Sequence, residues 1–162
     1  MAVQVNSAID YTDNDVNIIV TGIYTNIPGG DAGNLIWTIA SDFSSLKTLF
    51  PNILTCNMTY PDGKDTRIGT KRDLTFEGGG GAITTEELTE IDDNRYAGRY
   101  IQLQGLPVTN YTVSFNVMSE PNTALRWMIN YFDTASDKKT LATQVQSFFE
   151  GACTQLNTVL EG

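Results

Sequence analysis

The chain has 162 residues, of which 41% are hydrophobic and 18% are charged, a composition that predicts one globular domain rather than a disordered segment. Its formal net charge of −9 argues against nucleic acid and anionic membranes as partners, because like charges repel. No apolar run is long enough to span a bilayer. Residues 1–15 lack the basic start and apolar core of a signal peptide, so we expect a cytoplasmic protein.

Histidine is absent, and cysteine occurs only at Cys56 and Cys153. Without histidine, the chain cannot build a Ser-His or Cys-His nucleophile and lacks the commonest metal ligand. Two cysteines are too few for a disulfide framework or a zinc site, so we expect both to be small buried apolar residues. We therefore expect no metal and no cofactor. Any catalysis would depend on carboxylates, tyrosines, lysines or amides.

The pattern of apolar and turn residues predicts mostly β-strand before the last element. Residues 1–15 are polar and are expected to form a flexible N-terminal segment. Residues 16–24 are rich in β-branched residues and predict a first strand. Asp31 and Ser41-Asp42 can begin two short helices that end near residues 40 and 50. Six further strands, separated by turn residues, are predicted at residues 53–60, 67–76, 82–91, 95–103, 110–118 and 124–132.

Residues 137–160 predict one long amphipathic helix. Apolar residues recur at steps of three and four from Leu141 to Leu160, and Ser136 or Asp137 can cap the first turn. A long helix in a β-rich chain must bury its apolar face against the sheet, and tight turns join antiparallel neighbours. We therefore expect a single α+β domain over residues 16–162, with a curved seven-stranded antiparallel sheet around the final helix.

Three stretches carry a family likeness. In residues 36–56 a tryptophan is followed by Asp-Phe and by a strand with a cysteine; residues 88–95 read LTEIDDNR; and residues 105–111 place Gly-Leu-Pro before Asn-Tyr. Together with the final helix, they resemble the SRPBCC superfamily, which has the helix-grip fold. That superfamily includes START domains, the birch-pollen allergen (Bet v 1-like) family, polyketide cyclases and the plant abscisic-acid receptors. The pattern is closest to members like polyketide cyclase/dehydrases and the abscisic-acid receptors.

The resemblance implies a large apolar cavity between the sheet and the long helix. In the abscisic-acid receptors two loops close over the ligand; residues 77–82 match their gate loop and residues 105–108 match their latch loop. Leu54 falls near the receptor lysine that pairs with the hormone's carboxylate, so abscisic acid is not the expected ligand. Combined with the strand phase, the resemblance predicts ligand-binding side chains at Leu54, Met58, Leu74, Phe76, Leu88, Gln102, Leu106, Pro107, Val113, Met128, Asn130, Phe148 and Ala152.

Glu86 is the first candidate for catalysis, because it is predicted to face this cavity. Burial in an apolar cavity would raise its pKa and make it a general acid or base. The alternative is a structural ion pair with Arg72, Arg99 or Arg126, or a wet cavity edge.

Tyr100 and Tyr111 are the other catalytic candidates, since a phenol can donate a hydrogen bond to a ligand carbonyl or enolate. They could equally fill space, with their hydroxyls satisfied by protein or water. The four glycines at residues 78–81 lack the Lys-Ser/Thr of a phosphate loop. They are expected to form a flexible lid or a plain loose turn.

Two functions remain open. The first is a cofactor-independent enzyme of specialised biosynthesis, a lyase or isomerase that steers the cyclisation, dehydration or rearrangement of a chain held in the cavity. The second is a carrier or sensor that closes the gate loop over an apolar small molecule without chemistry. Fold alone does not decide between them. In either case we expect an apolar small molecule as partner, and a monomer or homodimer.

Overall fold

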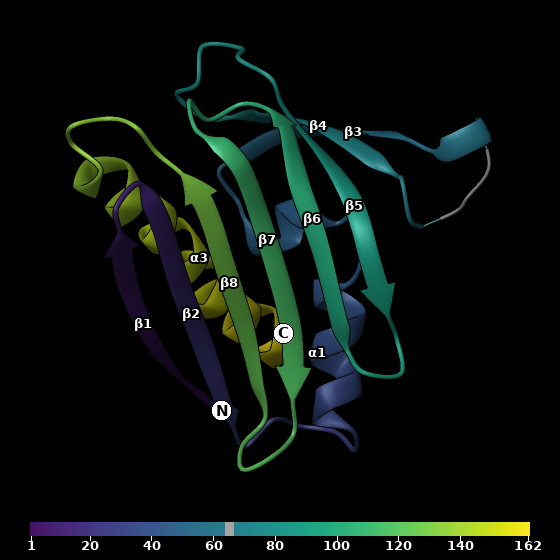
Figure 1. Ribbon diagram of the computed structural model, residues 1–162. Helices are drawn as coiled ribbons and strands as arrows, with labels where there is room; N and C mark the ends of the chain where they lie inside the picture. The colour runs from purple at the N-terminus through teal and green to yellow at the C-terminus, as the bar shows by residue number, and fades with distance from the viewer. Residues whose placement is uncertain (64–66) are drawn as a thin grey trace.

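The computed structural model, which describes residues 1–63 and 67–162, consists of one antiparallel sheet with helices on one of its faces (Figure 1). The spatial order of the strands is β1-β2-β8-β7-β6-β5-β4-β3. The expected α+β class, with a long C-terminal helix on an antiparallel sheet, is confirmed. The elements are β1 (Ala2–Thr12), β2 (Asp15–Thr25), α1 (Ala32–Ala40), α2 (Leu46–Leu49), β3 (Ile53–Thr59), a 3-10 turn (Pro61–Gly63), β4 (Lys71–Phe76), β5 (Thr84–Asp92), β6 (Ala97–Gln104), β7 (Thr109–Met118), β8 (Ala124–Phe132) and α3 (Lys139–Glu161).

The sheet has eight strands, and the prediction of seven is wrong. The additional strand is β1, in the segment that was expected to be loosely held. It pairs with β2 along its whole length, from Ala2 opposite Thr25 to Thr12 opposite Asp15. Val3, Val5 and Ile9 pack on the edge of the core, an alternation typical of a half-buried strand.

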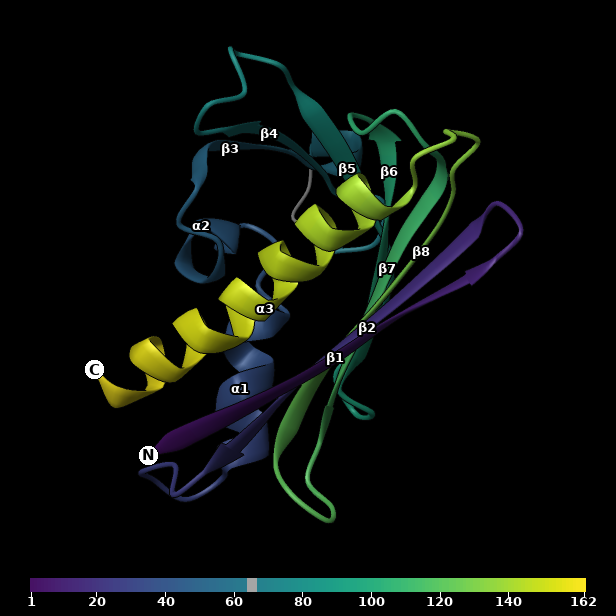
Figure 2. The same ribbon diagram turned by 90° about the vertical axis from the view of Figure 1, so that its left-hand side faces the viewer.

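The predicted long helix is confirmed as α3, which crosses the inner face of the sheet diagonally (Figure 2). Asp137 caps it, as expected: its carboxylate accepts hydrogen bonds from the backbone N–H of Lys139 and Thr140, at 3.1 and 3.3 Å, and from the Thr140 hydroxyl at 2.6 Å. The two short helices also form, although α2 is shorter than predicted. Asp31 caps α1 by accepting from the N–H of Asn34 at 3.0 Å.

The C-terminal half of α3 packs tightly on β2 and β8. Cys153 and Leu156 are fully buried there, in the same core as the strand residues Ile18 and Trp127. The Tyr24 hydroxyl donates to the backbone oxygen of Cys153 at 2.9 Å, which fixes the helix on β2. Close-packed interiors of this kind leave no room for a ligand.

The two cysteines are free thiols, and the expectation that both are buried is met by Cys153 alone. Cys153 is buried, whereas Cys56 is half-buried. No helix among the described residues is long and apolar enough to cross a membrane.

Candidate functional site

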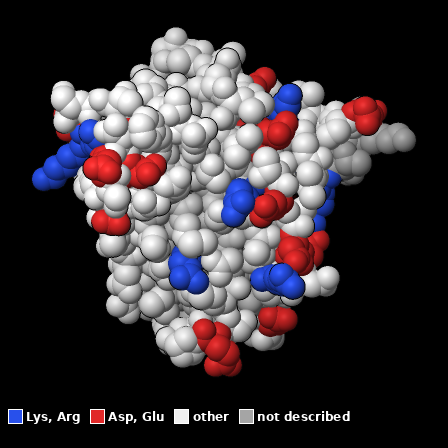
Figure 3. Space-filling view, in the orientation of Figure 1, with Lys and Arg blue, Asp and Glu red and all other residues white. Residues whose placement is uncertain are grey.

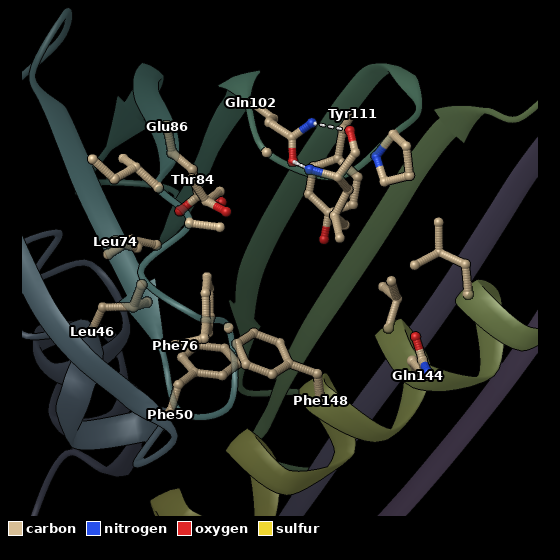
Figure 4. Close-up of a pocket in the computed structure, with 18 of the residues that line it drawn as sticks. Leu46, Phe50, Leu74, Phe76, Thr84, Glu86, Gln102, Tyr111, Gln144 and Phe148 are labelled. Atoms are coloured by element: carbon tan, nitrogen blue, oxygen red, sulfur yellow. Dashed lines mark hydrogen bonds between the residues drawn. The ribbon is translucent and has the colours of Figure 1, made fainter.

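A cavity of about 370 Å³ lies between the N-terminal half of α3 and strands β4 to β7 (Figure 4). Most of its wall is aliphatic or aromatic, which suits an apolar ligand. Most of its polar groups come from adjacent strands, Thr84 and Glu86 from β5, Tyr100 and Gln102 from β6, and Tyr111 from β7, and α3 adds Gln144. The remaining wall is formed by Leu46, Phe50, Leu74, Phe76, Gly79, Ala82, Ile83, Thr84, Gly105, Leu106, Pro107, Leu141, Gln144, Val145, Phe148 and Phe149.

Glu86 forms a buried ion pair with Arg72. The two residues are cross-strand partners on β4 and β5, and they are 7% and 2% exposed. Arg72 Nε donates to Glu86 Oε1 at 2.8 Å, and Nη2 lies 2.8 Å from the same oxygen. Of the alternatives open from the sequence, the structure therefore has the ion pair, and its partner is Arg72. The carboxylate nevertheless lines the cavity and points into it (Figure 4).

Arg72 is anchored by two aromatic rings and by a backbone oxygen. Its guanidinium carbon lies 3.7 Å from the centroid of the Phe43 ring and 4.6 Å from that of Tyr100, so the charge has a cation–π contact with each of two aromatic rings, which are tilted against one another by 58°. Nη1 donates to the Phe43 backbone oxygen at 3.1 Å. This anchoring fixes the position of the Glu86 carboxylate, because the guanidinium to which it is bound cannot swing away.

The ionisation of the site follows from its burial. Burial raises the pKa of Glu86, and the neighbouring Arg72 guanidinium acts against that rise. Burial also raises the pKa of Tyr100 and of Tyr111 well above the usual tyrosine range, and the negative charge of Glu86 adds to both shifts. The two phenols are therefore neutral hydrogen-bond donors throughout the physiological pH range.

The latch loop is clamped by Gln102 (Figure 4). The Gln102 side-chain amide donates to the backbone oxygen of Leu106 at 3.1 Å, and its oxygen accepts from the Leu106 N–H at 2.9 Å. Gly105 has a φ of +146°, and a Cβ there would lie 2.8 Å from the Thr84 side chain and 2.9 Å from the Gln102 oxygen. Glycine is therefore required at this point of the loop.

The gate loop joins β4 to β5 at the same end of the sheet as the latch loop (Figure 1). Gly78, Gly80 and Gly81 have positive φ angles, and a Cβ at any of them would have no neighbour within 4 Å. Gly79 and Ala82 line the cavity. The two loops therefore differ: the latch loop is tied down by side-chain hydrogen bonds, whereas Gly78, Gly80 and Gly81 of the gate loop have open space around them.

Most of the residues predicted for the site meet at this cavity. Its lining includes all three catalytic candidates, Glu86, Tyr100 and Tyr111. Those predicted ligand-binding residues that also line it are Leu74, Phe76, Gln102, Leu106, Pro107 and Phe148.

Three predicted positions face away from the cavity. Leu54 is 53% exposed, because the pairing of β3 with β4 shifts between Ile53 and Thr55. On β8 the assumed phase is wrong by one residue: Trp127 and Ile129 point inward, so Met128 and Asn130 lie on the outer face. The Asn130 amide donates there to Asn17 Oδ1 at 2.7 Å.

The remaining predicted residues are inside the fold without lining this cavity. Val113 and Ala152 are buried in the packed core. Met58 and Leu88 line a second, more polar hollow of about 690 Å³, formed with α1 and with the Arg67–Asp93 ion pair.

Sequence reasoning missed several wall residues and, above all, the role of Arg72. It had considered Arg72 only as one of three alternative partners. A signal existed: Arg72 stands two residues before Leu74 and four before Phe76, so it shares their inward phase. Leu141 and Val145, on the apolar face predicted for the long helix, line the cavity from α3.

The surface gives no sign of a polyanion-binding face on the side shown in Figure 3. Acidic and basic side chains are interspersed there over the outer face of the sheet. Basic side chains do not form a contiguous patch on this face. Among the described residues, no cluster of acidic, cysteine or histidine side chains could hold a metal ion.

Residues 33–161 match the model of a family described as polyketide cyclase/dehydrase and lipid transport. The chain belongs to this family, and the resemblance to the SRPBCC superfamily is confirmed. No curated protein sequence matches the chain.

Solved structures share the fold at low sequence identity. An uncharacterised protein from Bacillus thuringiensis has a TM-score of 0.68 and 18% identity, over 99% of this chain and 100% of its own. The protein XoxI from Bacillus cereus has the same TM-score and identity, over 99% and 96% of the two chains. Major latex-like protein 151 from Panax ginseng has a TM-score of 0.68 and 17% identity, over 90% and 97%. Family and fold together suggest a protein that binds a hydrophobic ligand.

Proposed function

We propose that the protein binds an apolar small molecule in the cavity and steers its cyclisation or dehydration. The observation that carries this proposal is a carboxylate, Glu86, fixed in an otherwise apolar cavity beside the neutral phenols Tyr100 and Tyr111. Such a cavity can hold a flexible chain in a folded conformation and place a base beside hydrogen-bond donors.

The chemistry that these groups fit is an intramolecular aldol condensation. Glu86 takes a proton from a carbon between two carbonyl groups, and a tyrosine hydroxyl donates a hydrogen bond to the enolate oxygen. The enolate carbon then bonds to a second carbonyl carbon of the same chain. The proton on Glu86 passes to the new alkoxide, and loss of water gives the cyclised, dehydrated product. No oxidant or other co-reactant is consumed.

A carrier or sensor is the second candidate, and the buried ion pair favours it. Because Glu86 already serves as counter-charge to Arg72, its role could be to stabilise β4 against β5. The flexible gate loop would then control entry and release of a ligand that leaves unchanged.

Binding is tested by filling the cavity. Val145 lines it from α3, so Val145→Phe should abolish binding of a fluorescent apolar probe or reduce it at least about 10-fold. Thr143→Phe, on an exposed position of the same helix, is the matched control and should bind as the wild type does. Equal probe binding by wild type and Val145→Phe would contradict the proposed site.

Catalysis is tested with a synthetic poly-β-ketone that also cyclises slowly without protein. The wild type should accelerate the reaction and narrow its products, and Glu86→Gln should lower the rate by about 100-fold or more. Glu90→Gln makes the same chemical change on the same strand but outside the cavity, so it should keep the wild-type rate. Binding of the poly-β-ketone without acceleration by the wild type would leave the carrier as the function.

A further inference from the structure

The charges around the cavity are arranged asymmetrically. Among the described lining residues, Glu86 is the only one with an ionisable carboxyl, ammonium or guanidinium group. Arg72 lies behind it and does not contribute to the cavity wall; its guanidinium is enclosed by Phe43, Tyr100 and Glu86. A molecule in the cavity therefore meets the carboxylate side of the ion pair.

The pair is neutral as a unit. Arginine side chains stay protonated in proteins, and Glu86 is the counter-charge within contact distance of Arg72. A buried carboxylate ligand would leave the cavity with a net negative charge, and an amine cation would leave it with a net positive one. Either is strongly unfavourable in an apolar environment, so only an uncharged ligand keeps the balance.

The hydrogen-bonding capacity of the site points the same way. The two Arg72 nitrogens that contact Glu86, Nε and Nη2, both lie against its Oε1 atom. Among the described residues, no donor forms a hydrogen bond to Oε2. An ionised carboxylate can only accept, so the partner of Oε2 must be a donor. An uncharged organic molecule supplies that donor most simply as a hydroxyl group, whose oxygen can in turn accept from Tyr100 or Tyr111.

We propose that the ligand of this cavity is an uncharged apolar molecule carrying an alcohol or phenol group, and that carboxylic acids and alkylamines are rejected. This ligand class rests on the proposed function, since it presupposes that the cavity binds an apolar molecule. It adds which polar group the molecule carries and where that group lies, against Glu86 Oε2.

Two matched series test the proposal by calorimetry on the wild-type protein near neutral pH. The first is octanol, octane, octanoate and octylammonium. The second is naphthol, methylnaphthalene and naphthoate, with the same ring attachment. Octanol and naphthol should bind at least about 10-fold more tightly than the parent hydrocarbons, because they gain a hydrogen bond to a charged group. Octanoate, octylammonium and naphthoate should bind more weakly than the hydrocarbons.

Three variants assign the preference to the ion pair. The double variant Arg72→Met/Glu86→Leu removes both charges and keeps a similar side-chain volume, a type of replacement that often preserves folding. In this variant the alcohols and the hydrocarbons should bind with nearly equal affinity. Glu86→Gln leaves Arg72 without a counter-charge, so it should improve the binding of octanoate relative to octanol. Glu90→Gln, at the exposed pair with Arg99, should keep all wild-type preferences. If Glu86→Gln does not fold, as judged by circular dichroism, the double variant carries the test.

The failures of the two proposals are distinguishable. Wild-type protein that binds octane and methylnaphthalene but shows no preference for the hydroxylated partners would overturn the ligand class alone. The same holds if octanoate binds as tightly as octanol, or if the double variant keeps the hydroxyl preference. A wild-type protein that binds no member of either series would overturn the proposed binding function as well.

Discussion

The two halves of α3 face the same sheet with different results. The C-terminal half, with Cys153 and Leu156, is fully buried against the strands that include β2 and β8. The N-terminal half, with Leu141, Val145 and Phe148, faces a cavity over β4 to β7. One amphipathic helix thus serves as core at one end and as cavity wall at the other.

The difference lies in what fills the space under the helix. At the packed end, Trp127 and Tyr24 reach up from the sheet, and Tyr24 bonds directly to the helix backbone. At the hollow end the sheet offers a charged pair instead, and the Arg72 guanidinium has cation–π contacts with Phe43 and Tyr100. Apolar burial stabilises the first end, while the second keeps polar groups in place around unfilled volume. The packed end therefore anchors the helix on the sheet, and we propose that the hollow end holds the ligand.

The largest effect is expected from breaking the buried ion pair of the hollow end. Arg72→Ala leaves Glu86 without its counter-charge, so it should lower the free energy of unfolding by about 3–5 kcal/mol. Arg99→Ala removes an exposed partner, 3.2 Å from Glu90, and should cost less than about 1 kcal/mol. Urea denaturation measures both. Equal costs would show that burial does not set the importance of the Arg72 pair.

A leucine truncation at each end of α3 compares the halves directly. Leu156 is fully buried, so Leu156→Ala should cost about 2–5 kcal/mol through lost burial and a new cavity. Leu141 is only half-buried beside existing free volume, so Leu141→Ala should cost clearly less. Thermal and urea unfolding report both values. If the two costs coincide, the hollow end is packed as tightly as the other.

The latch loop should be sensitive to a single methyl group. Gly105→Ala introduces a Cβ against Thr84 and Gln102 at a positive φ, so we expect a loss of about 1–3 kcal/mol and faster ligand release. Gly30→Ala, where a Cβ meets nothing within 4 Å and φ is not positive, is the control and should be close to neutral. Stopped-flow release of a fluorescent apolar probe separates loop opening from global stability. An unchanged release rate in Gly105→Ala would argue against a closed latch loop.

The smallest effect is expected on the acid stability of the first turn of α3, where Asp137 lies. Hydrogen bonds from Thr140 lower the pKa of Asp137 below its ordinary value of 3.8. A lowered pKa in the folded state contributes stability that is present above pH 3.8 and is lost as the pH falls through the folded-state value. Asp137→Asn keeps an acceptor for the cap but removes the titration, so its stability should depend less on pH in this range. As the pH falls, amide hydrogen exchange should speed up at the hollow end of α3 before it does so at the packed end. The reverse order would contradict the role of Asp137 in stabilising the first turn.

Local patterns allowed much of the fold to be predicted. The cap at Asp137 and the steps of three and four in α3 depend only on nearby residues, and so does the Asp31 cap of α1. In β1 the pattern was present but weak, because Val3, Val5 and Ile9 are separated by several polar residues and the strand is only half-buried. Its pairing partner was needed to identify it.

The site was harder to predict, because it depends on register between strands. In β8 both faces carry apolar residues, so the sequence did not determine whether Met128 or Ile129 points inward, and a shift of one residue exchanges the faces. The bulge that turns Leu54 outward leaves no clear mark in the sequence. Likewise, Arg72 could be chosen from three candidate partners of Glu86 only once β4 and β5 were aligned.

The central claim is that the hollow end of α3 holds a ligand. Native mass spectrometry of the purified protein, followed by extraction and identification of whatever co-purifies, tests it most directly. We predict a bound uncharged apolar molecule with a hydroxyl group, present in the wild type and in Thr143→Phe and absent from Val145→Phe. A clean mass of the chain alone, together with no binding of the octyl or naphthyl series, would contradict the claim and leave α3 as an ordinary core helix.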